Sequence, residues 1–233
     1  MAVAIESSNE IVWSNQTARS WTITPTGLNR CLVLFGVFRT ATSNGVTSSV
    51  TVGGTNATYI TKKYYTNYVW SELYYFINPS LSELTCTWTL DRSANSSYPS
   101  ISGCFSLSGV HQDTPISESG VANGASSATF NYSTAEVDGM IFSCAYRESA
   151  VTWDAPSIEY HDAGIKTVAY SSVLTVTNPV AKVTGTNVYM STCAVAPHLG
   201  PPKVKTWNGV AIANVKTING VAIANVKSIQ GLT

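Results

Sequence analysis

Few side chains suited to acid–base or metal chemistry occur in this sequence. Its three histidines, His111, His161 and His198, form no His-x-His or His-x-x-x-His pair, so the common zinc patterns are missing. The cluster Glu159-Tyr-His161-Asp162 places acids beside a histidine. On a strand, Glu159 and His161 would share one face and could form a metal or acid–base pair. A hydrogen-bond network within a loop is the simpler interpretation.

The five cysteines are odd in number and widely spaced, with no Cys-x-x-Cys pair, so zinc and dithiol redox sites have no sequence support. Each lies in an apolar stretch, which favours buried free thiols; a disulfide between neighbouring strands is the alternative. Gly-x-Ser-x-Gly, Walker and Gly-x-Gly-x-x-Gly motifs are also missing. We therefore expect a non-enzymatic protein without cofactor or metal. The cysteines are Cys31, Cys86, Cys104, Cys144 and Cys193.

An aromatic cluster lies between residues 64 and 76. Alternate members suit the core of a sheet, while aromatics with polar tips also anchor protein interfaces or stack on sugars. Tyr64, Tyr65 and Tyr68 come at the loop end of the cluster, so they are the candidate glycan-binding or interface residues. The full cluster is Tyr64, Tyr65, Tyr68, Trp70, Tyr74, Tyr75 and Phe76.

The composition excludes several classes of protein. Only 11% of the 233 residues are charged, against about 25% in an average soluble protein, and the 13 basic residues balance 13 acidic ones. A 44% hydrophobic content argues against disorder, and zero net charge against a general nucleic-acid binder. The longest apolar run, residues 31–38, is too short to span a membrane. The first six residues lack the basic and apolar regions of a signal peptide, so we expect folding in a cytoplasm.

The elements that must position these side chains are strands. Short runs rich in β-branched and aromatic residues alternate with Gly, Pro, Asn and Ser, which predicts an all-β, two-sheet antiparallel sandwich or jelly roll. Residues 31–38 and 69–77 are apolar on both faces and predict central strands. Residues 84–90 alternate between apolar and Thr side chains, as a half-buried strand does. The other predicted strands are 20–24, 49–52, 57–62, 101–107, 128–132, 137–146, 168–177 and 187–195.

The C-terminal tail is an internal repeat. After an N-terminal segment (1–19) and the sandwich body (20–195), a Pro-rich linker (196–204) leads to repeats of 11 residues in 205–233. Asn-Gly recurs in each full copy and predicts a two-residue hairpin, because a type I′ turn needs positive φ at both central positions. Such hairpins cannot bury their own apolar faces. We expect the tail to pack on its own body, on an identical subunit or on a larger assembly; a tail disordered in free solution is the alternative.

The zero net charge conceals a division between body and tail. Residues 203–233 carry four lysines and no acid, so the tail is +4, while residues 1–202 are −4. Opposite signs favour docking of tail on body, although charged edges also discourage unwanted strand pairing. The residues to which we assign assembly are Trp207, Asn208, Gly209, Val210, Ile212, Lys216, Asn219, Gly220, Val221, Ile223 and Lys227.

Four segments carry a family resemblance. They are Asn29-Arg-Cys-Leu-Val-Leu-Phe-Gly-Val37, Val52-Gly-Gly54, Glu72-Leu-Tyr-Tyr-Phe-Ile-Asn-Pro79 and Ser108-Gly-Val-His-Gln-Asp-Thr-Pro-Ile116. In this order they resemble a β-sandwich domain of bacteriophage and bacterial surface proteins, over residues 20–195. The tail is similar to the Lys-x-x-Asn-Gly tails that end many phage structural proteins. None of these motifs is catalytic.

The resemblance implies a phage virion component, such as a capsid decoration, a head fibre or a tail-associated protein. Its partners would be other virion proteins and copies of itself, with assembly mediated by the tail. A glycan-binding adhesin or receptor-binding module of a phage tail, using the loop tyrosines on host surface glycans, is the alternative. A glycoside hydrolase is a third hypothesis, because paired carboxylates need not be close in sequence.

Overall fold

The structure is a computed structural model of the chain. It describes residues 1–40, 42, 45–66, 68–147, 151–162, 166–198, 206–207, 210–211, 217–218 and 221–222. The chain divides into two units, Met1–His198 and Leu199–Thr233, and this boundary falls within the predicted linker. The described residues form antiparallel strands and no helix, so none of them forms a helix that could cross a bilayer. The predicted all-β antiparallel class is confirmed.

The first unit contains two β-sandwiches that follow one another along the chain, where the sequence analysis expected one. The first sandwich spans residues 4–108. Its inner sheet consists, in spatial order, of β1 (Ala4–Trp13), β9 (Ser100–Ser108), β3 (Cys31–Arg39), β7 (Val69–Ile77) and β6 (Thr58–Thr66). Its outer sheet consists of β2 (Ala18–Ile23), β8 (Leu84–Leu90), β4 (Thr47–Val52) and β5 (Thr55–Asn56).

The second sandwich spans residues 116–195 and repeats this arrangement. Its inner sheet consists of β10 (Ile116–Gly124), β17 (Val188–Val195), β12 (Met140–Tyr146), β15 (Lys166–Ser171) and β14 (Ser157–Asp162). Its outer sheet consists of β11 (Ser127–Asn131), β16 (Val180–Thr184) and β13 (Thr152–Trp153). In each sandwich the first strand pairs with the last and the second with the last but one, which is the nested order of a jelly roll.

Two β-bulges recur at equivalent places and fix the alignment of the sandwiches. They lie between Ile5 and Ser7 in β1, Ile116 and Glu118 in β10, Tyr59 and Thr61 in β6, and Glu159 and His161 in β14. At the first pair of bulges, Ile5 pairs with Leu107 and Ile116 pairs with Val195, so Leu107 of β9 is equivalent to Val195 of β17. Those residues pair with Cys31 and Met140, which are therefore equivalent in turn. The second pair of bulges gives the same alignment independently, so the first unit is an internal duplication.

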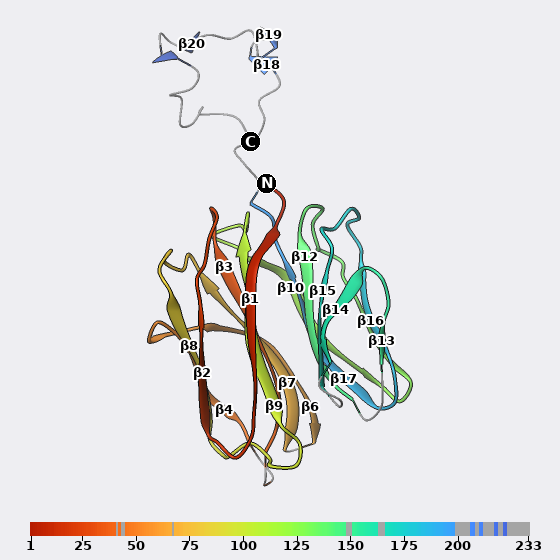
Figure 1. The fold of residues 1–233 in the computed structure, drawn as a ribbon. Coiled ribbons are helices and arrows are strands. Elements are labelled where there is room, and N and C mark those ends of the chain that lie inside the picture. Colours follow the sequence, from red (N-terminus) through yellow and green to blue (C-terminus); the bar gives the residue numbers. More distant parts are fainter. Residues whose placement is uncertain are drawn as a thin grey trace. The chain divides into compact units, whose positions relative to one another are not determined.

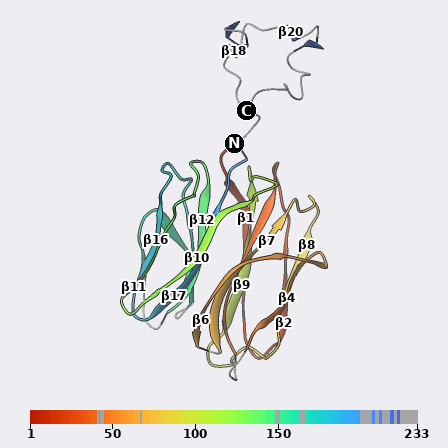
Figure 2. The same cartoon turned by 180° about the vertical axis from the view of Figure 1, so that it is seen from behind.

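The four sheets stack as layers, with the two inner sheets facing each other, as Figures 1 and 2 show. One apolar cluster fills the space between the inner sheets, and it includes Phe35, Phe105 and Phe142. A second cluster lies within the first sandwich and a third within the second. The inner strands are therefore covered on both faces, which explains why β3, β9 and β12 read as continuously apolar or small residues.

The sandwiches meet in an approximately two-fold manner. β6 of the first lies against β10 and β17 of the second. Reciprocally, β14 of the second contacts β1 of the first, where Tyr160 Oη donates a hydrogen bond to Ser8 Oγ at 2.9 Å. These two sets of contacts are equivalent, because β14 is the counterpart of β6 and β1 is the counterpart of β10. An isologous dimer interface repeats its contacts in the same way. We call the β6 side the first seam and the β14 side the second seam.

The strands that the sequence analysis missed are mostly at sheet edges. The N-terminal segment set apart there contains β1, which pairs along its length with β9 and belongs to the first sandwich. β10 and β14 were also missed, and all three are edge strands of the inner sheets. Edge strands carry polar residues on their exposed side, so their apolar alternation is weak. The predicted central strands 31–38 and 69–77 correspond to β3 and β7 and are confirmed as interior strands.

The second unit contains two described hairpins. β18 (Thr206–Trp207) pairs with β19 (Val210–Ala211), and β20 (Thr217–Ile218) pairs with β21 (Val221–Ala222), both antiparallel. Two residues separate the innermost pairs Trp207–Val210 and Ile218–Val221, and in both cases they are Asn-Gly. The predicted two-residue connections therefore agree with the observed pairing.

Candidate functional site

A buried carboxylate, Glu72 of β7, is the centre of a polar cluster in the first sandwich. Glu72 is completely buried and lies directly opposite Lys62 of β6 in the strand register. Lys62 Nζ is 3.0 Å from Glu72 Oε2. On the other oxygen, Trp70 Nε1 donates a hydrogen bond to Oε1 at 2.8 Å, and Thr47 Oγ1 donates a second one. We call these four residues the Glu72 cluster.

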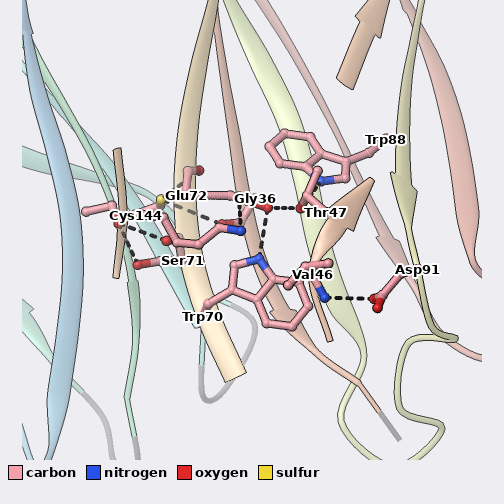
Figure 3. Close-up of polar contacts among 11 residues, drawn as sticks. Gly36, Val46, Thr47, Trp70, Ser71, Glu72, Trp88, Asp91 and Cys144 are labelled. Atoms are coloured by element: carbon pink, nitrogen blue, oxygen red, sulfur yellow. Dashed lines mark hydrogen bonds and ion pairs between the residues drawn. The ribbon is translucent and has the colours of Figure 1, made fainter. Parts of the chain in front are cut away.

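The Glu72 cluster connects the two sheets of the first sandwich, as Figure 3 shows. Thr47, at the start of β4, also accepts a hydrogen bond from Trp88 Nε1 of β8 at 3.1 Å. A β-bulge between Thr47 and Ser49 sets the position of this hydroxyl. The cluster therefore links β6 and β7 of the inner sheet to β4 and β8 of the outer sheet.

The same segment of β7 also contacts the second sandwich. Ser71 Oγ lies 3.0 Å from Ser191 Oγ of β17, and Ser191 Oγ donates to the backbone oxygen of Ser71 at 2.9 Å. Cys144 Sγ of β12 contacts the backbone oxygen of Glu72 at 3.5 Å (Figure 3). Alternation along β7 thus directs the Glu72 side chain into one core and Ser71 toward the other sandwich.

The electrostatics of the Glu72 cluster fit a structural ion pair. Burial alone would lower the pKa of Lys62, but the Glu72 carboxylate outweighs it and the pKa is raised. The ammonium also lies 5.3 Å from the Tyr64 ring centroid and 5.5 Å from that of Trp70, within cation–π range. Burial and the Glu72 charge raise the pKa of Tyr74. Both Glu72 oxygens are engaged, so the carboxylate serves as an acceptor that fixes neighbouring side chains.

The predicted acid–histidine cluster is divided by the bulge in β14. Because Tyr160 occupies the bulge, Glu159 and His161 are consecutive in the pairing with β15, opposite Ala169 and Val168. Across the second seam, His161 Nδ1 contacts Glu10 Oε1 of β1. His161 thus joins the two sandwiches. The sequence could not indicate Glu10, which is 151 positions away.

The three candidate loop tyrosines have different environments. Tyr64 is 42% exposed. Tyr65 stacks on Tyr146 with ring centroids 5.3 Å apart and lies 4.5 Å from the Tyr189 ring, in the first seam. Tyr68 is also partly buried against the cluster between the inner sheets. Two of the three therefore contact the second sandwich or the core, and Tyr64 alone of this set is an exposed aromatic.

All five cysteines are buried and free, which confirms the predicted free thiols. Burial raises the pKa of the Cys31 thiol to about 12, and it also raises the pKa values of Cys144 and Cys193. A thiol must ionise to act as a nucleophile or metal ligand. The position of these residues therefore suits packing in the strands from which they project.

Most candidate assembly residues of the tail lie outside the described residues. Trp207, Val210 and Val221 are described as paired strand residues. The remaining candidates lie outside them, namely Asn208, Gly209, Ile212, Lys216, Asn219, Gly220, Ile223 and Lys227. The assembly role of the whole set stays a prediction.

Glu72 and Lys62 were not among the predicted site residues, although the sequence carries a signal for Glu72. It is the one charged residue in the otherwise apolar run 69–77, and a charge in a central strand requires a partner. Lys62 could be found only from the strand register.

Comparison with known proteins adds no assignment. Among the described residues, no group of three or more His, Cys, Asp or Glu side chains could hold a metal ion. The chain matches no protein-family model, and no curated protein matches it. Function is therefore inferred from the fold, the tail and the sequence resemblance.

Proposed function

We propose that this protein is a non-enzymatic structural component of a bacteriophage virion, assembled through its repeat tail. The observation that carries the proposal is the division of the chain into a duplicated jelly-roll body and a separate unit of repeated hairpins. Jelly rolls are common building blocks of viral capsids. The family resemblance of residues 20–195 and of the tail supports the same placement, as a capsid decoration, head fibre or tail-associated protein.

The body and the tail have different parts in this proposal. The body buries its own strands in three apolar clusters and is a compact unit by itself. Two-residue strand pairs cannot form such a core, so the tail needs neighbours. Its net charge of +4 complements the −4 of residues 1–202. Other virion proteins and further copies of this chain are the proposed partners.

A truncation tests the tail. Met1–His198 should remain folded, because its clusters are internal to that unit, and should stay monomeric where the full chain forms larger species. Light scattering coupled to size exclusion would measure both. A full-length variant with the four tail lysines replaced by Gln is the matched control. If it no longer assembles, charge drives docking; if it still assembles, apolar burial does. Equal assembly by the truncated and full chains would contradict the proposed role.

The adhesin alternative retains Tyr64 as its one exposed aromatic among the three proposed. Tyr65 and Tyr68 are held against the second sandwich or the core. A glycan array with the full chain, repeated with Tyr64→Ala, would test it. Signal lost in that variant would favour a receptor-binding module.

A further inference from the structure

A cavity opens in the second seam, where β14 and β15 of the second sandwich meet β1 and β9 of the first. Its volume is about 490 Å³. Sites for small molecules usually measure roughly 300–1,000 Å³ and favour interfaces between structural units. The cavity is remote in sequence from the candidate loop tyrosines and lies on the other seam.

Three aromatic rings line this cavity. Phe105 of β9 lies 4.7 Å from Tyr160 of β14 and 5.7 Å from Tyr170 of β15, both edge to face. Met140 and Val3 add apolar surface. Aromatic faces of this kind pack well against the C–H face of a ring-shaped ligand.

Hydroxyl groups complete the lining. Ser8, Ser171 and Ser172 line the cavity with the aromatic residues. Tyr160 Oη donates to Ser8 Oγ at 2.9 Å, and Ser171 Oγ accepts a hydrogen bond from the backbone N–H of Ile141 at 2.8 Å. Ser171 is buried, so its hydroxyl supports the wall of the cavity, whereas the hydroxyl hydrogen of the exposed Ser8 is available to donate to a ligand. None of the described lining residues carries a charge, so the lining suits a neutral ligand that combines apolar faces with hydroxyls.

The equivalent positions in the first seam show that the fold does not require this lining. The alignment of the sandwiches places Cys193 at the position of Phe105 and Ile60 at that of Tyr160. Ile77 occupies the position of Ser172. Tyr170, Ser8 and Ile5 have identical counterparts in Tyr75, Ser119 and Ile116. At three positions, therefore, the second seam carries two aromatic rings and a hydroxyl where the first seam carries a thiol and two aliphatic side chains.

We propose that the cavity of the second seam binds a neutral pyranose unit of a saccharide. The half-buried rings of Tyr160 and Tyr170, which pack on the buried Phe105, would contact its C–H face, and the exposed hydroxyls of Ser8 and Ser172 would bind its hydroxyl groups. This binding goes beyond the proposed assembly function and does not depend on it, because no tail residue takes part.

Calorimetric titration of the full chain tests the site, with a panel of neutral monosaccharides and disaccharides that includes glucose, galactose, mannose and N-acetylglucosamine. We expect at least one panel member to bind, and Tyr170→Ala to weaken it about tenfold, as loss of an aromatic anchor does. Tyr75→Ala is the matched control, because it makes the same truncation at the equivalent position, and it should leave the affinity unchanged.

A second variant avoids disturbing the core. Ser172 is exposed at the rim of the cavity, so Ser172→Trp should obstruct the cavity while the urea midpoint of unfolding stays near that of the parent. Sugar binding that survives both Tyr170→Ala and Ser172→Trp would overturn the assignment. Failure of every sugar to bind would overturn it too, as would binding of apolar ligands such as a short-chain detergent in place of sugars.

Discussion

Apart from the two-residue β5, the two sandwiches have the same strand order, and they share the same two bulges, but their cores are built differently. The first encloses four tryptophans, Trp13, Trp21, Trp70 and Trp88. The second has six alanines among the thirteen described residues of its buried cluster and a single buried tryptophan, Trp153. Nested pairing and bulge positions are therefore compatible with very different side-chain volumes. The comparison indicates that strand pairing specifies this topology, while the core residues set how strongly each sandwich is held.

The polar groups inside the sandwiches differ in the same way. The alignment makes Glu72 equivalent to Thr167 of β15. Glu72 accepts from an indole N–H and pairs with Lys62, whereas the Thr167 hydroxyl accepts from Trp153 Nε1 at 2.9 Å and needs no cation. In both cores an indole N–H donates a hydrogen bond, to a carboxylate in the first and to a neutral hydroxyl in the second.

Removing Lys62 should show the largest difference between the sandwiches. Lys62→Met leaves the Glu72 carboxylate completely buried without its cation, which typically costs about 3–5 kcal/mol in the free energy of unfolding. Urea denaturation followed by tryptophan fluorescence would measure it, because Trp70 belongs to the Glu72 cluster and Trp88 donates a hydrogen bond to its Thr47.

Two further variants sharpen that result. Lys62→Met combined with Glu72→Leu should recover most of the lost stability, since replacing a buried pair by apolar residues is often neutral or stabilising. Thr167→Ala should cost less, about 1–3 kcal/mol, because it leaves only the Trp153 N–H unsatisfied. Equal losses of unfolding free energy in Lys62→Met and Thr167→Ala would show that an unpaired buried carboxylate is no more destabilising than an unpaired buried N–H.

Lys166, a buried lysine of the second sandwich, should respond in the opposite direction. Lys166 is 1% exposed, and burial, with a smaller contribution from Arg39, lowers its pKa to about 7. Lys166→Met therefore removes an unfavourable buried cation and should stabilise the protein at pH 7 by on the order of 2 kcal/mol. Urea midpoints of the variant and parent at pH 7 measure the change.

The pH dependence gives Lys166 a signature of its own. The folded pKa lies below the unfolded value of about 10.4, so the unfolded state binds more protons between these values, and stability rises with pH from about 7 upward. The slope from this residue reaches about 1.4 kcal/mol per pH unit. The difference between parent and Lys166→Met isolates it, because the buried thiols and tyrosines contribute equally to both. Parallel pH profiles would contradict this account.

The sequence predicted the interior of the fold better than its edges. The run 69–77 matches β7 and the run 84–90 matches β8, because burial on one or both faces leaves a clear apolar pattern. β1 and β10 alternate with Glu, Ser and Asn, and both escaped prediction. Since these equivalent edge strands carry one of the recurring bulges, the duplication could not be recognised without them.

The candidate site was less predictable for a related reason. Equivalent positions such as Glu72 and Thr167, or Phe105 and Cys193, share backbone pairing and no side-chain chemistry. Lys62 and Glu10 acquire their partners through the strand register and the second seam, at separations that a sequence pattern does not record. The Asn-Gly hairpins were predictable, because two adjacent residues specify such a turn.

The smallest expected effect concerns a pair of equivalent positions, one in each sandwich, that carry different side chains. Gly103 of β9 is equivalent to Ser191 of β17. A Cβ at Gly103 would lie 2.5 Å from the Asn9 backbone oxygen and 2.6 Å from Phe35 Cζ, so Gly103→Ala must displace β1. We expect a loss of about 1–2 kcal/mol in urea denaturation.

Ser191→Gly is the reciprocal change. It removes the hydrogen bond from Ser191 to Ser71 between the sandwiches and should lower the free energy of unfolding by about 1 kcal/mol. If Gly103→Ala were as stable as the parent, β1 would be free to shift, and its bulge would not be a fixed element of the duplicated fold. A loss in both variants would show that equivalent positions in the two sandwiches have become specialised: one for close approach of an edge strand, the other for a hydrogen bond between the sandwiches.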